Sequence, residues 1–421
     1  MRDAGRGEPR ELQASRGTRE AEDRDALAVI ASVHGIGPGT LDRLLEGGQR
    51  PSELLRAARR PGGIREIRNA GRSDGIGRSV MSEAVADRLV AAARAPEAVL
   101  ESMDRAGVHA LAFDDRAYPR RLREIALPPR VLFVRGSNDA LDPIHSVAVV
   151  GTRRPTDGGR RTARRIASAL TRAGALVVSG LAIGIDGEAH AAVVAESGPT
   201  VAVIGGGHAR LAPASHDRLA EAIVAGGGAV ISEHAPGTEP TRGTFPRRNR
   251  LISGLADAVV VIEAGARSGS LLTAAWALEQ GRECFFVPDT IDAPQSAGSL
   301  AWLRDYAGVA RIVSGVPQLL EDLGLVLNEK AISVPDLPSR PAGVTPPALG
   351  ARLPSIDAQA ASLADREGTL LRAIARGAAT ADELAAVTRL PIGAVLGGLT
   401  ALESAGLIEG RYGRVQLAGS S

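Results

Sequence analysis

Short apolar runs recur through the middle of the chain, and segments with a helical pattern of apolar positions lie between them. Each run is rich in valine, isoleucine and alanine, as expected for a strand that helices cover on both faces. One helix fits between successive runs, which is the arrangement of β-α-β units. The pattern predicts an α/β fold with an extended Rossmann-like, doubly wound, mostly parallel sheet. The runs occupy residues 147–150, 176–179, 201–204, 229–232, 258–263 and 284–288.

The segment after the first run combines an apolar stripe with a dense arginine face. Apolar side chains recur at i, i+3, i+4 and i+7, the spacing of one helix face: Ala163, Ile166, Ala167 and Leu170. Arginines fill the other side. Between residues 153 and 165, six arginines stand against one acid, Asp157, so we expect a charge of about +5 at this end of the sheet.

Composition and pattern change on both sides of the predicted sheet domain, which covers residues 136–325. Residues 1–24 mix charges with glycine and serine and lack periodicity, which predicts a disordered tail. Residues 25–135 have a helical pattern throughout. Residues 326–360 are proline-rich and predict a semi-extended linker. Residues 361–421 read as three helices and a hairpin, the order of a winged helix.

The helical domain contains the segment "VHGIGPGTLDRLLEGG" at residues 33–48. Gly35 and Gly37 lie between two helical patterns, as in the turn of a helix-hairpin-helix or SAM-like domain. Glycines in such a turn let backbone amides approach a DNA phosphate. A tight turn inside a small packed helical bundle has the same signature, so the pattern leaves both interpretations open.

The charge of the predicted winged helix bears on its role. Residues 361–421 hold six arginines and six acids, and the expected recognition helix, "PIGAVLGGLTALE", has no basic residue. A reader of duplex DNA needs cations to neutralise phosphates. We therefore expect a protein-contact or regulatory module. Thr380 and Glu383 have the spacing of a capping box at its second helix.

Composition excludes several classes of protein. The chain has 421 residues and a formal net charge of +2, and its one lysine, Lys330, precedes Ala331, so there is no Walker A sequence. Cys284 is the sole cysteine, which predicts neither a disulfide framework nor a cysteine metal site. We expect no cofactor and no metal. No apolar run is long enough to span a bilayer, so we expect a cytoplasmic protein without a membrane partner.

Glycines, small hydroxyls and arginines follow the predicted strands. Ligands of open α/β sheets bind outside the carboxyl ends of the strands, so these residues converge on one rim. Amides and hydroxyls can bind phosphate oxygens, and arginine adds a charge-assisted partner. The candidate phosphate-binding residues are Gly151, Thr152, Arg153, Arg154, Ser179, Gly180, Gly184, Gly205, Gly207, Phe245, Arg247, Arg248, Asn249, Arg250, Ser268, Gly269, Ser270 and Thr273.

The cations at the start of one predicted helix oppose its dipole. Arg248 and Arg250 precede the apolar positions Leu251, Ile252 and Leu255, which must face inward. Arginine in a first turn is unfavourable unless an anion compensates it. We interpret this conflict as a sign of an external anion, with a solvated first turn as the alternative.

Four other polar residues follow the strands, and we expect structural roles for them. Asp186 is interpreted as a helix N-cap and His190 as a hydrogen-bonded core histidine. Glu233 and Glu263 could hold a metal or read a base edge, but we favour hydrogen bonds within the protein. No residue is assigned a catalytic role, and we predict that the protein is not an enzyme.

Together these motifs resemble the DprA/Smf family, the DNA-processing proteins of natural transformation. The similarity rests on Gly151-Thr152-Arg153, "SGLAIGID" (179–186), "VIGGG" (203–207) and above all residues 245–283. It implies binding of single-stranded DNA, protection of incoming DNA, loading of RecA past single-strand-binding protein, and a homodimer. It places DNA contacts at the first of these motifs and around Arg248 and Arg250.

The chain departs from the family pattern at two loops. The loop after the third strand reads "HARLAPASH", with Ala209 and Ala212-Pro213 where the family usually has an aspartate and Tyr-Pro. Pro288-Asp289 stands where Pro-Gly is usual. Both changes lie on the expected binding rim, so they affect ligand details more than the fold.

Two enzyme classes offer alternatives. Phosphoribohydrolases of a related Rossmann group bind phosphate at such a rim, but their motif carries a glutamate after the small-residue turn. The corresponding "EAGARSGSLLTA" (263–274) lacks that glutamate. A nicotinamide-dependent oxidoreductase needs a second glycine soon after Gly151 and an acid at the end of the second strand, where Ser179 stands.

Overall fold

The computed structural model describes residues 10–45, 48–70, 81–241, 243–325, 365–376 and 380–390, with parts of 395–417. The chain divides into two compact units, Met1–Ile332 and Ser333–Ser421. Within the described residues, no helix has both the length and the apolar character that a membrane crossing requires.

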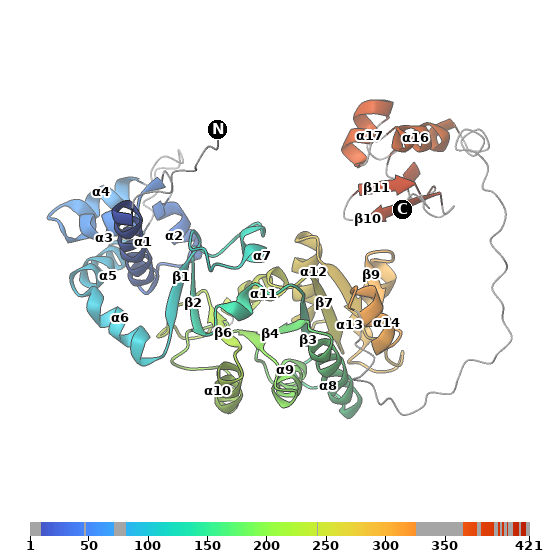
Figure 1. Ribbon diagram of the computed structural model, residues 1–421, viewed down its shortest axis with the longest axis horizontal. Coiled ribbons are helices and arrows are strands. Elements are labelled where there is room, and N and C mark those ends of the chain that lie inside the picture. The colour runs from blue at the N-terminus through green and yellow to red at the C-terminus, as the bar shows by residue number, and fades with distance from the viewer. Residues whose placement is uncertain are drawn as a thin grey trace, which may run out of the picture. The chain divides into compact units, whose positions relative to one another are not determined.

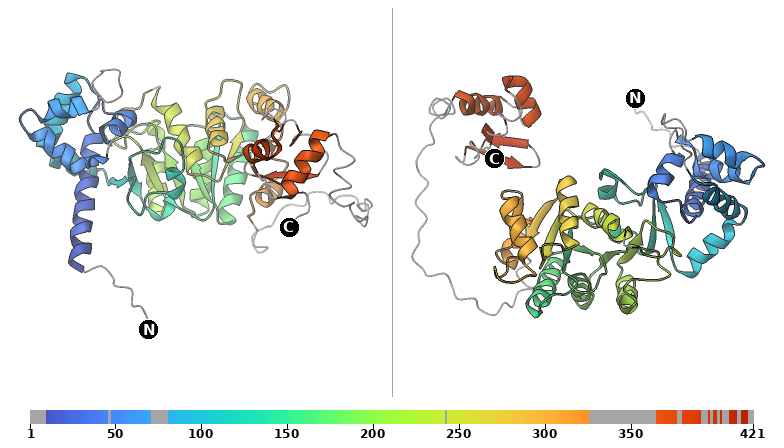
Figure 2. Two further views of the ribbon diagram at one scale, coloured as in Figure 1. Left: turned by 90° about the horizontal axis from the view of Figure 1, so that it is seen from above. Right: turned by 180° about the vertical axis from the view of Figure 1, so that it is seen from behind.

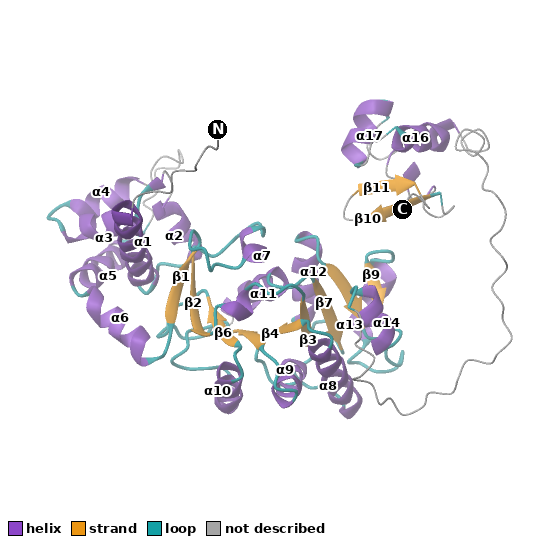
Figure 3. Cartoon of the chain, viewed as in Figure 1, coloured by secondary structure: helices purple, strands orange, loops and turns teal. Residues whose placement is uncertain are grey.

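The described part of the first unit contains a nine-stranded sheet of order β1-β2-β6-β5-β4-β3-β7-β8-β9 (Figures 1 and 3). Strands β3 to β9 run parallel to one another, whereas β2 pairs antiparallel with β1 and β6. Every apolar run that predicted a strand is a strand, which confirms the α/β, Rossmann-like fold. These strands are β3 (Ser146–Gly151), β4 (Leu176–Ser179), β5 (Thr200–Val203), β6 (Ala229–Ser232), β7 (Ala258–Ile262) and β8 (Glu283–Phe286), followed by β9 (Ala310–Ile312).

Helices cover both faces of the sheet, because successive side chains of a strand point to opposite faces. Val147 and Val149 pack with α8, α9 and α14, whereas Ala148 and Val150 pack beneath α7, α11 and α12. Figure 2 shows the two helical layers from behind. The helices are α7 (Arg120–Arg123), α8 (Asp157–Arg172), α9 (Ile185–Ala195), α10 (Asp217–Ala225), α11 (Thr244–Gly254), α12 (Ser270–Glu279), α13 (Ala297–Asp305) and α14 (Val316–Asp322), with short 3-10 turns at Asp139–Leu141 and Ala214–His216.

The N-terminal helices share a separate core with the first two strands. Phe133 is fully buried in this core, on the face of β2 turned toward the helices. β1 (His109–Ala112) and β2 (Val131–Gly136) belong to the sheet, so the predicted boundary at residue 135 falls inside a strand and must move to the start of β1. The helices are α1 (Arg10–Ala31), α2 (Pro38–Leu45), α3 (Pro51–Arg59), α4 (Gly63–Ala70), α5 (Glu83–Arg94) and α6 (Pro96–Arg105).

The prediction of a disordered tail over residues 1–24 is wrong from Arg10 onward, where α1 begins. Tertiary contacts anchor the helix although its sequence lacks an apolar period. Asp23 accepts hydrogen bonds from the Arg50 guanidinium at 2.7 Å and from the Ser52 amide at 3.2 Å. Residues 1–9 lie outside the described part of the chain.

The turn between α1 and α2 requires glycine. Gly35 has φ +99°, and a Cβ there would lie 2.7 Å from Val85 Cγ2 of α5. The turn thus packs against its own bundle, as both interpretations of the segment allow. Its contact with DNA stays a prediction.

The second unit contains α16 (Asp365–Ala375), α17 (Ala381–Thr388) and the hairpin of β10 (Ile408–Arg411) and β11 (Arg414–Leu417). The capping box is confirmed, because the Thr380 amide donates to Glu383 at 3.1 Å and the Glu383 amide donates to the Thr380 hydroxyl at 3.3 Å. The predicted linker, 326–360, and most of the expected recognition helix lie outside the described residues.

Candidate nucleic-acid interface

A cavity of about 640 Å³ opens at the carboxyl edge of the sheet, between the loops that follow β3 and β7. These strands are neighbours, with Gly151 opposite Ile262, but the chain order reverses between them. The loops that leave them therefore diverge and create a crevice, the usual ligand position in such sheets.

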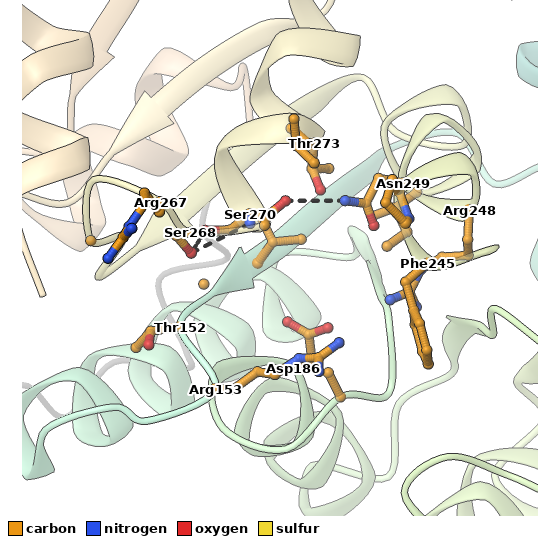
Figure 4. A pocket seen from close by; sticks show the side chains of 18 of the residues that line it. Thr152, Arg153, Asp186, Phe245, Arg248, Asn249, Arg267, Ser268, Ser270 and Thr273 are labelled. Atoms are coloured by element: carbon orange, nitrogen blue, oxygen red, sulfur yellow. Dashed lines mark hydrogen bonds between the residues drawn. The ribbon is translucent and has the colours of Figure 1, made fainter. Parts of the chain in front are cut away.

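The cavity brings together residues from four segments of the chain, and Figure 4 shows the main side chains. They come from the end of β3 and the loop after it, the loop before α9 and its start, the first turns of α11, and the loop between β7 and α12 with the first turn of α12. The lining residues are Val150, Gly151, Thr152, Arg153, Arg154, Ala182, Asp186, Phe245, Pro246, Arg248, Asn249, Ile252, Gly265, Ala266, Arg267, Ser268, Gly269, Ser270, Leu272 and Thr273.

Three exposed arginines stand at the cavity. Arg153 and Arg154 follow β3, and Arg267 lies across from them in the loop after β7. The Arg153 guanidinium lies 5.4 Å from the centre of the Phe245 ring. Arg267 is not among the residues predicted from the sequence, although its position as a cation in a loop of small residues after a strand was a signal for it.

Small polar groups line the side formed by α11 and α12. Asn249 Nδ2 donates to the Gly269 carbonyl at 3.1 Å, and the Ser268 and Ser270 hydroxyls lie 2.7 Å apart (Figure 4). Ser270 is the first residue of α12, so the positive end of that helix dipole faces the cavity. The hydroxyls and this helix end together favour an anion.

Arg248 also reaches the cavity, but its side chain serves the protein itself. It is 5% exposed and donates to the Gly180 carbonyl at 2.5 Å and to the Val203 carbonyl. Burial lowers the pKa of this guanidinium to about 10, and the nearby Asp186 opposes the shift. Arg248 therefore ties α11 to the loop after β4 and to the last residue of β5.

Asp186 is not the N-cap that we predicted, because Gly184 occupies that position of α9. Its carboxylate turns back and accepts a hydrogen bond from the Gly180 amide at 3.2 Å. Burial raises the pKa of this carboxyl, and Arg248 partly offsets the rise. Asp186 and Arg248 together fix the loop after β4 beneath the cavity.

The prediction that Arg250 faces an external anion is wrong. Arg250 is 6% exposed, does not line the cavity, and forms a buried ion pair with Glu233 at the end of β6. The compensating charge is therefore internal. The first turn of α11 is partly exposed, but every residue from Arg248 to Gly254 is buried.

The remaining predicted residues do not line the cavity. Gly184 has φ +94°, and a Cβ there would lie 2.4 Å from the Thr152 carbonyl oxygen, so only glycine fits beneath this loop. The Ser179 hydroxyl donates to the Val149 carbonyl at 2.6 Å. The residues outside the lining are Ser179, Gly180, Gly184, Gly205, Gly207, Arg247 and Arg250.

Glu263 and His190 have structural hydrogen bonds, in line with the interpretation from sequence. Glu263 accepts from the Thr156 amide at 2.9 Å and from its hydroxyl, and so fixes the start of α8 beside β7. His190 Nδ1 lies 2.9 Å from the Thr200 hydroxyl. Burial lowers the pKa of His190 to about 3.

The expected charge of about +5 at this end of the sheet is an overestimate. Glu188 of α9 accepts hydrogen bonds from Arg160 at 2.8 Å and from Arg164 at 2.7 Å. α8 also leads away from the rim, so its later arginines are not at the cavity.

Known proteins match most of the chain. A family model described as "DNA recombination-mediator protein A" matches residues 109–324, and the model of the DprA winged helix domain matches residues 354–414. Protein Smf of Synechocystis sp. is 35% identical over 398 residues, which cover 90% of this chain and 94% of that protein. The chain belongs to the DprA/Smf family.

Two further matches extend the comparison. DNA processing protein DprA of Bacillus subtilis is 39% identical over 209 residues, 50% of this chain and 70% of that protein. The X-ray structure of DprA from Streptococcus pneumoniae has a TM-score of 0.50 and 31% identity, and the match covers 64% of this chain and 96% of that one. The first of the two family models begins at β1, in agreement with the corrected start of the sheet domain.

Proposed function

We propose that this DprA/Smf protein binds single-stranded DNA at the cavity and acts as a binding protein, not as an enzyme. The observation that carries the proposal is the set of exposed arginines, Arg153, Arg154 and Arg267, around a bed of hydroxyls and backbone amides. Such a set suits successive phosphates, because each cation can accompany one phosphate while amides and hydroxyls donate hydrogen bonds to its remaining oxygens.

The composition of the cavity favours binding without sequence preference. Phe245 is the aromatic residue among the lining residues, so base stacking can contribute at one position only. Contacts to phosphates dominate in such a site and make the affinity depend on salt.

Replacement of two cavity arginines tests the proposal. Arg153→Ala combined with Arg267→Ala should weaken binding to labelled oligothymidylate by about a hundredfold, if each contact contributes about 1.4 kcal/mol. Fluorescence anisotropy measures this, and matched single-stranded and duplex probes show the preference for single strands. Arg304→Ala is the control, since Arg304 is exposed and pairs with Asp305 on α13. Unchanged binding by the double variant would contradict the proposal.

Membership of the DprA/Smf family supports a further proposal, which concerns the proteins that act with this one on the bound strand. We propose that the protein protects incoming single strands, loads RecA onto them past single-strand-binding protein, and acts as a homodimer. RecA ATP hydrolysis on strands covered by single-strand-binding protein should start sooner when this protein is added. Light scattering should give twice the mass of one chain. An unchanged lag and a monomeric mass would reject these two extensions.

A nucleotide-cleaving enzyme of the phosphoribohydrolase type is the alternative. Asp186 is the carboxylate among the cavity-lining residues, and its raised pKa would suit proton transfer. Its hydrogen bond to the Gly180 amide and its contact with Arg248 favour a structural role instead. Incubation with nucleoside monophosphates should release no free base, and release that Asp186→Asn abolishes would support the enzyme.

A further inference from the structure

α8 carries two arginine pairs whose surroundings differ. Arg160 and Arg164 turn toward α9, where Glu188 binds both. Arg161 and Arg165 lie one position further round the helix and are exposed. Within the described part of the chain, neither forms an ion pair or a hydrogen bond through its side chain.

The helix leaves a purely polar face to the solvent. Its two large apolar side chains, Ile166 and Leu170, are buried against the sheet, and Arg161 and Arg165 lie on the opposite side. An exposed face without large apolar groups does not suit a protein partner, whose binding needs a buried apolar centre. It suits a hydrated polyanion.

Local energetics also indicate an external anion. Like charges four residues apart destabilise a helix. Glu188 compensates one such pair, and Glu196 compensates Arg172, whose Nε donates to it at 2.9 Å. Arg161 and Arg165 form no such ion pair among the described residues, and the one acid near them on α8 is Asp157, four residues before Arg161.

The uncompensated pair continues directly from the cavity. Thr156 caps α8, and the loop before it contains the cavity residues Arg153 and Arg154. Arg161 follows in the second turn of the helix and Arg165 in the third. Two residues four positions apart are separated by about 6 Å along the helix axis. Neighbouring phosphates of one strand can match this spacing.

We propose that Arg161 and Arg165 form an exit track for the single strand held in the cavity. The strand leaves the cavity past Arg154 and runs along the exposed face of α8, with phosphates beside each arginine. This inference rests on the proposed function and deepens it, because it states the direction in which the DNA leaves the site.

The test compares short and long oligonucleotides on the full chain. Oligothymidylates of about 4 and about 16 nucleotides span the range of single-strand site sizes. The variant is Arg161→Ala with Arg165→Ala, and the matched control is Arg172→Ala, which removes an already compensated arginine from the same face. The cavity variant Arg153→Ala with Arg267→Ala is measured beside them.

We expect the α8 variant to bind the long oligonucleotide about tenfold more weakly and the short one as the parent does. The slope of log affinity against log salt for the long one should fall by about 1.4, since two phosphate contacts are lost. Arg172→Ala should match the parent. The melting temperature should not fall, because alanine favours the helix and the repulsion is removed. Arg161→Gln with Arg165→Gln provides the same test with longer side chains.

Parent-like binding of the long oligonucleotide by both α8 variants would overturn the exit track, and so would an equal loss for short and long. Either result leaves the proposed function intact if the cavity variant loses affinity for both lengths. If the cavity variant keeps its affinity for both, the proposed function fails whatever the α8 variants do.

Discussion

Two arginine pairs lie near the same edge of the sheet, yet only one pair has both members exposed. Arg153 and Arg154 follow β3 and are both exposed beside the cavity. Arg247 and Arg248 lie in the first turns of α11, where the first is exposed outside the cavity lining and the second is buried. The pairs differ in what supports them: a loop presents the first, whereas a deeply packed helix holds the second. A count of arginines in a sequence is therefore no measure of the charge that a ligand meets.

The strongest way to sharpen this comparison is to remove the buried cation that follows, Arg250. Arg250→Ala leaves Glu233 without its partner inside the protein, so we expect a loss of about 3–5 kcal/mol in the free energy of unfolding. Urea denaturation measures the loss. Arg247→Ala, three residues earlier and exposed, should change stability by less than about 0.5 kcal/mol.

A second pair of variants separates the lost partner from the lost volume. Arg250→Met with Glu233→Leu removes both charges and keeps apolar bulk, so it should recover most of the stability that Arg250→Ala loses. If Arg250→Ala is as stable as the parent, Glu233 does not compensate the charge of Arg250. The claim that the first turns of α11 need no external anion is then wrong.

A smaller effect should come from the buried imidazole of His190. Its pKa is about 3 in the folded protein, against an ordinary value of 6.5, because burial penalises the charged form. Between pH 3 and pH 6.5 the unfolded chain binds more protons at this group than the folded protein does. The stability that His190 contributes is therefore complete above pH 6.5 and is lost as the pH falls toward 3. At pH 5 the loss should be about 2 kcal/mol.

His190→Asn isolates that contribution, since the other groups titrate alike in both proteins. The drop in unfolding free energy from pH 7 to pH 5 should be about 2 kcal/mol smaller in the variant than in the parent. Equal drops would mean that His190 takes up its proton without unfolding, and that the packing around it is looser than described.

The fold could be predicted from the sequence wherever an element has a strong apolar pattern of its own. The apolar runs identified the parallel strands, and the stripe ending at Leu170 identified the buried face of α8. β1 and β2 were missed because they lie in a stretch of helical pattern and pair antiparallel with each other. α1 was missed over residues 10–24 because its sequence lacks an apolar period, and contacts from distant residues, such as that of Arg50 with Asp23, hold the helix.

Part of the candidate site could be predicted from the sequence. The loops after β3 and β7 were placed at the rim because strand ends in a parallel sheet must meet there, and Arg153 and Ser270 line the cavity as predicted. The partners of Arg248 and Arg250 could not be predicted from the sequence, because they lie in distant segments: the loop after β4, the end of β5 and the residue after β6. Only tertiary packing shows that a cation is already paired.

The salt dependence of single-strand binding tests the central claim most directly, namely that the exposed arginines at the cavity hold phosphates. The slope of log affinity against log salt should flatten by about 0.7 for Arg153→Ala, because one phosphate contact is lost. Arg247→Ala, which removes an exposed arginine outside the cavity lining, should keep the parent slope. If Arg153→Ala and the parent give parallel lines, the cavity is not where the DNA backbone binds.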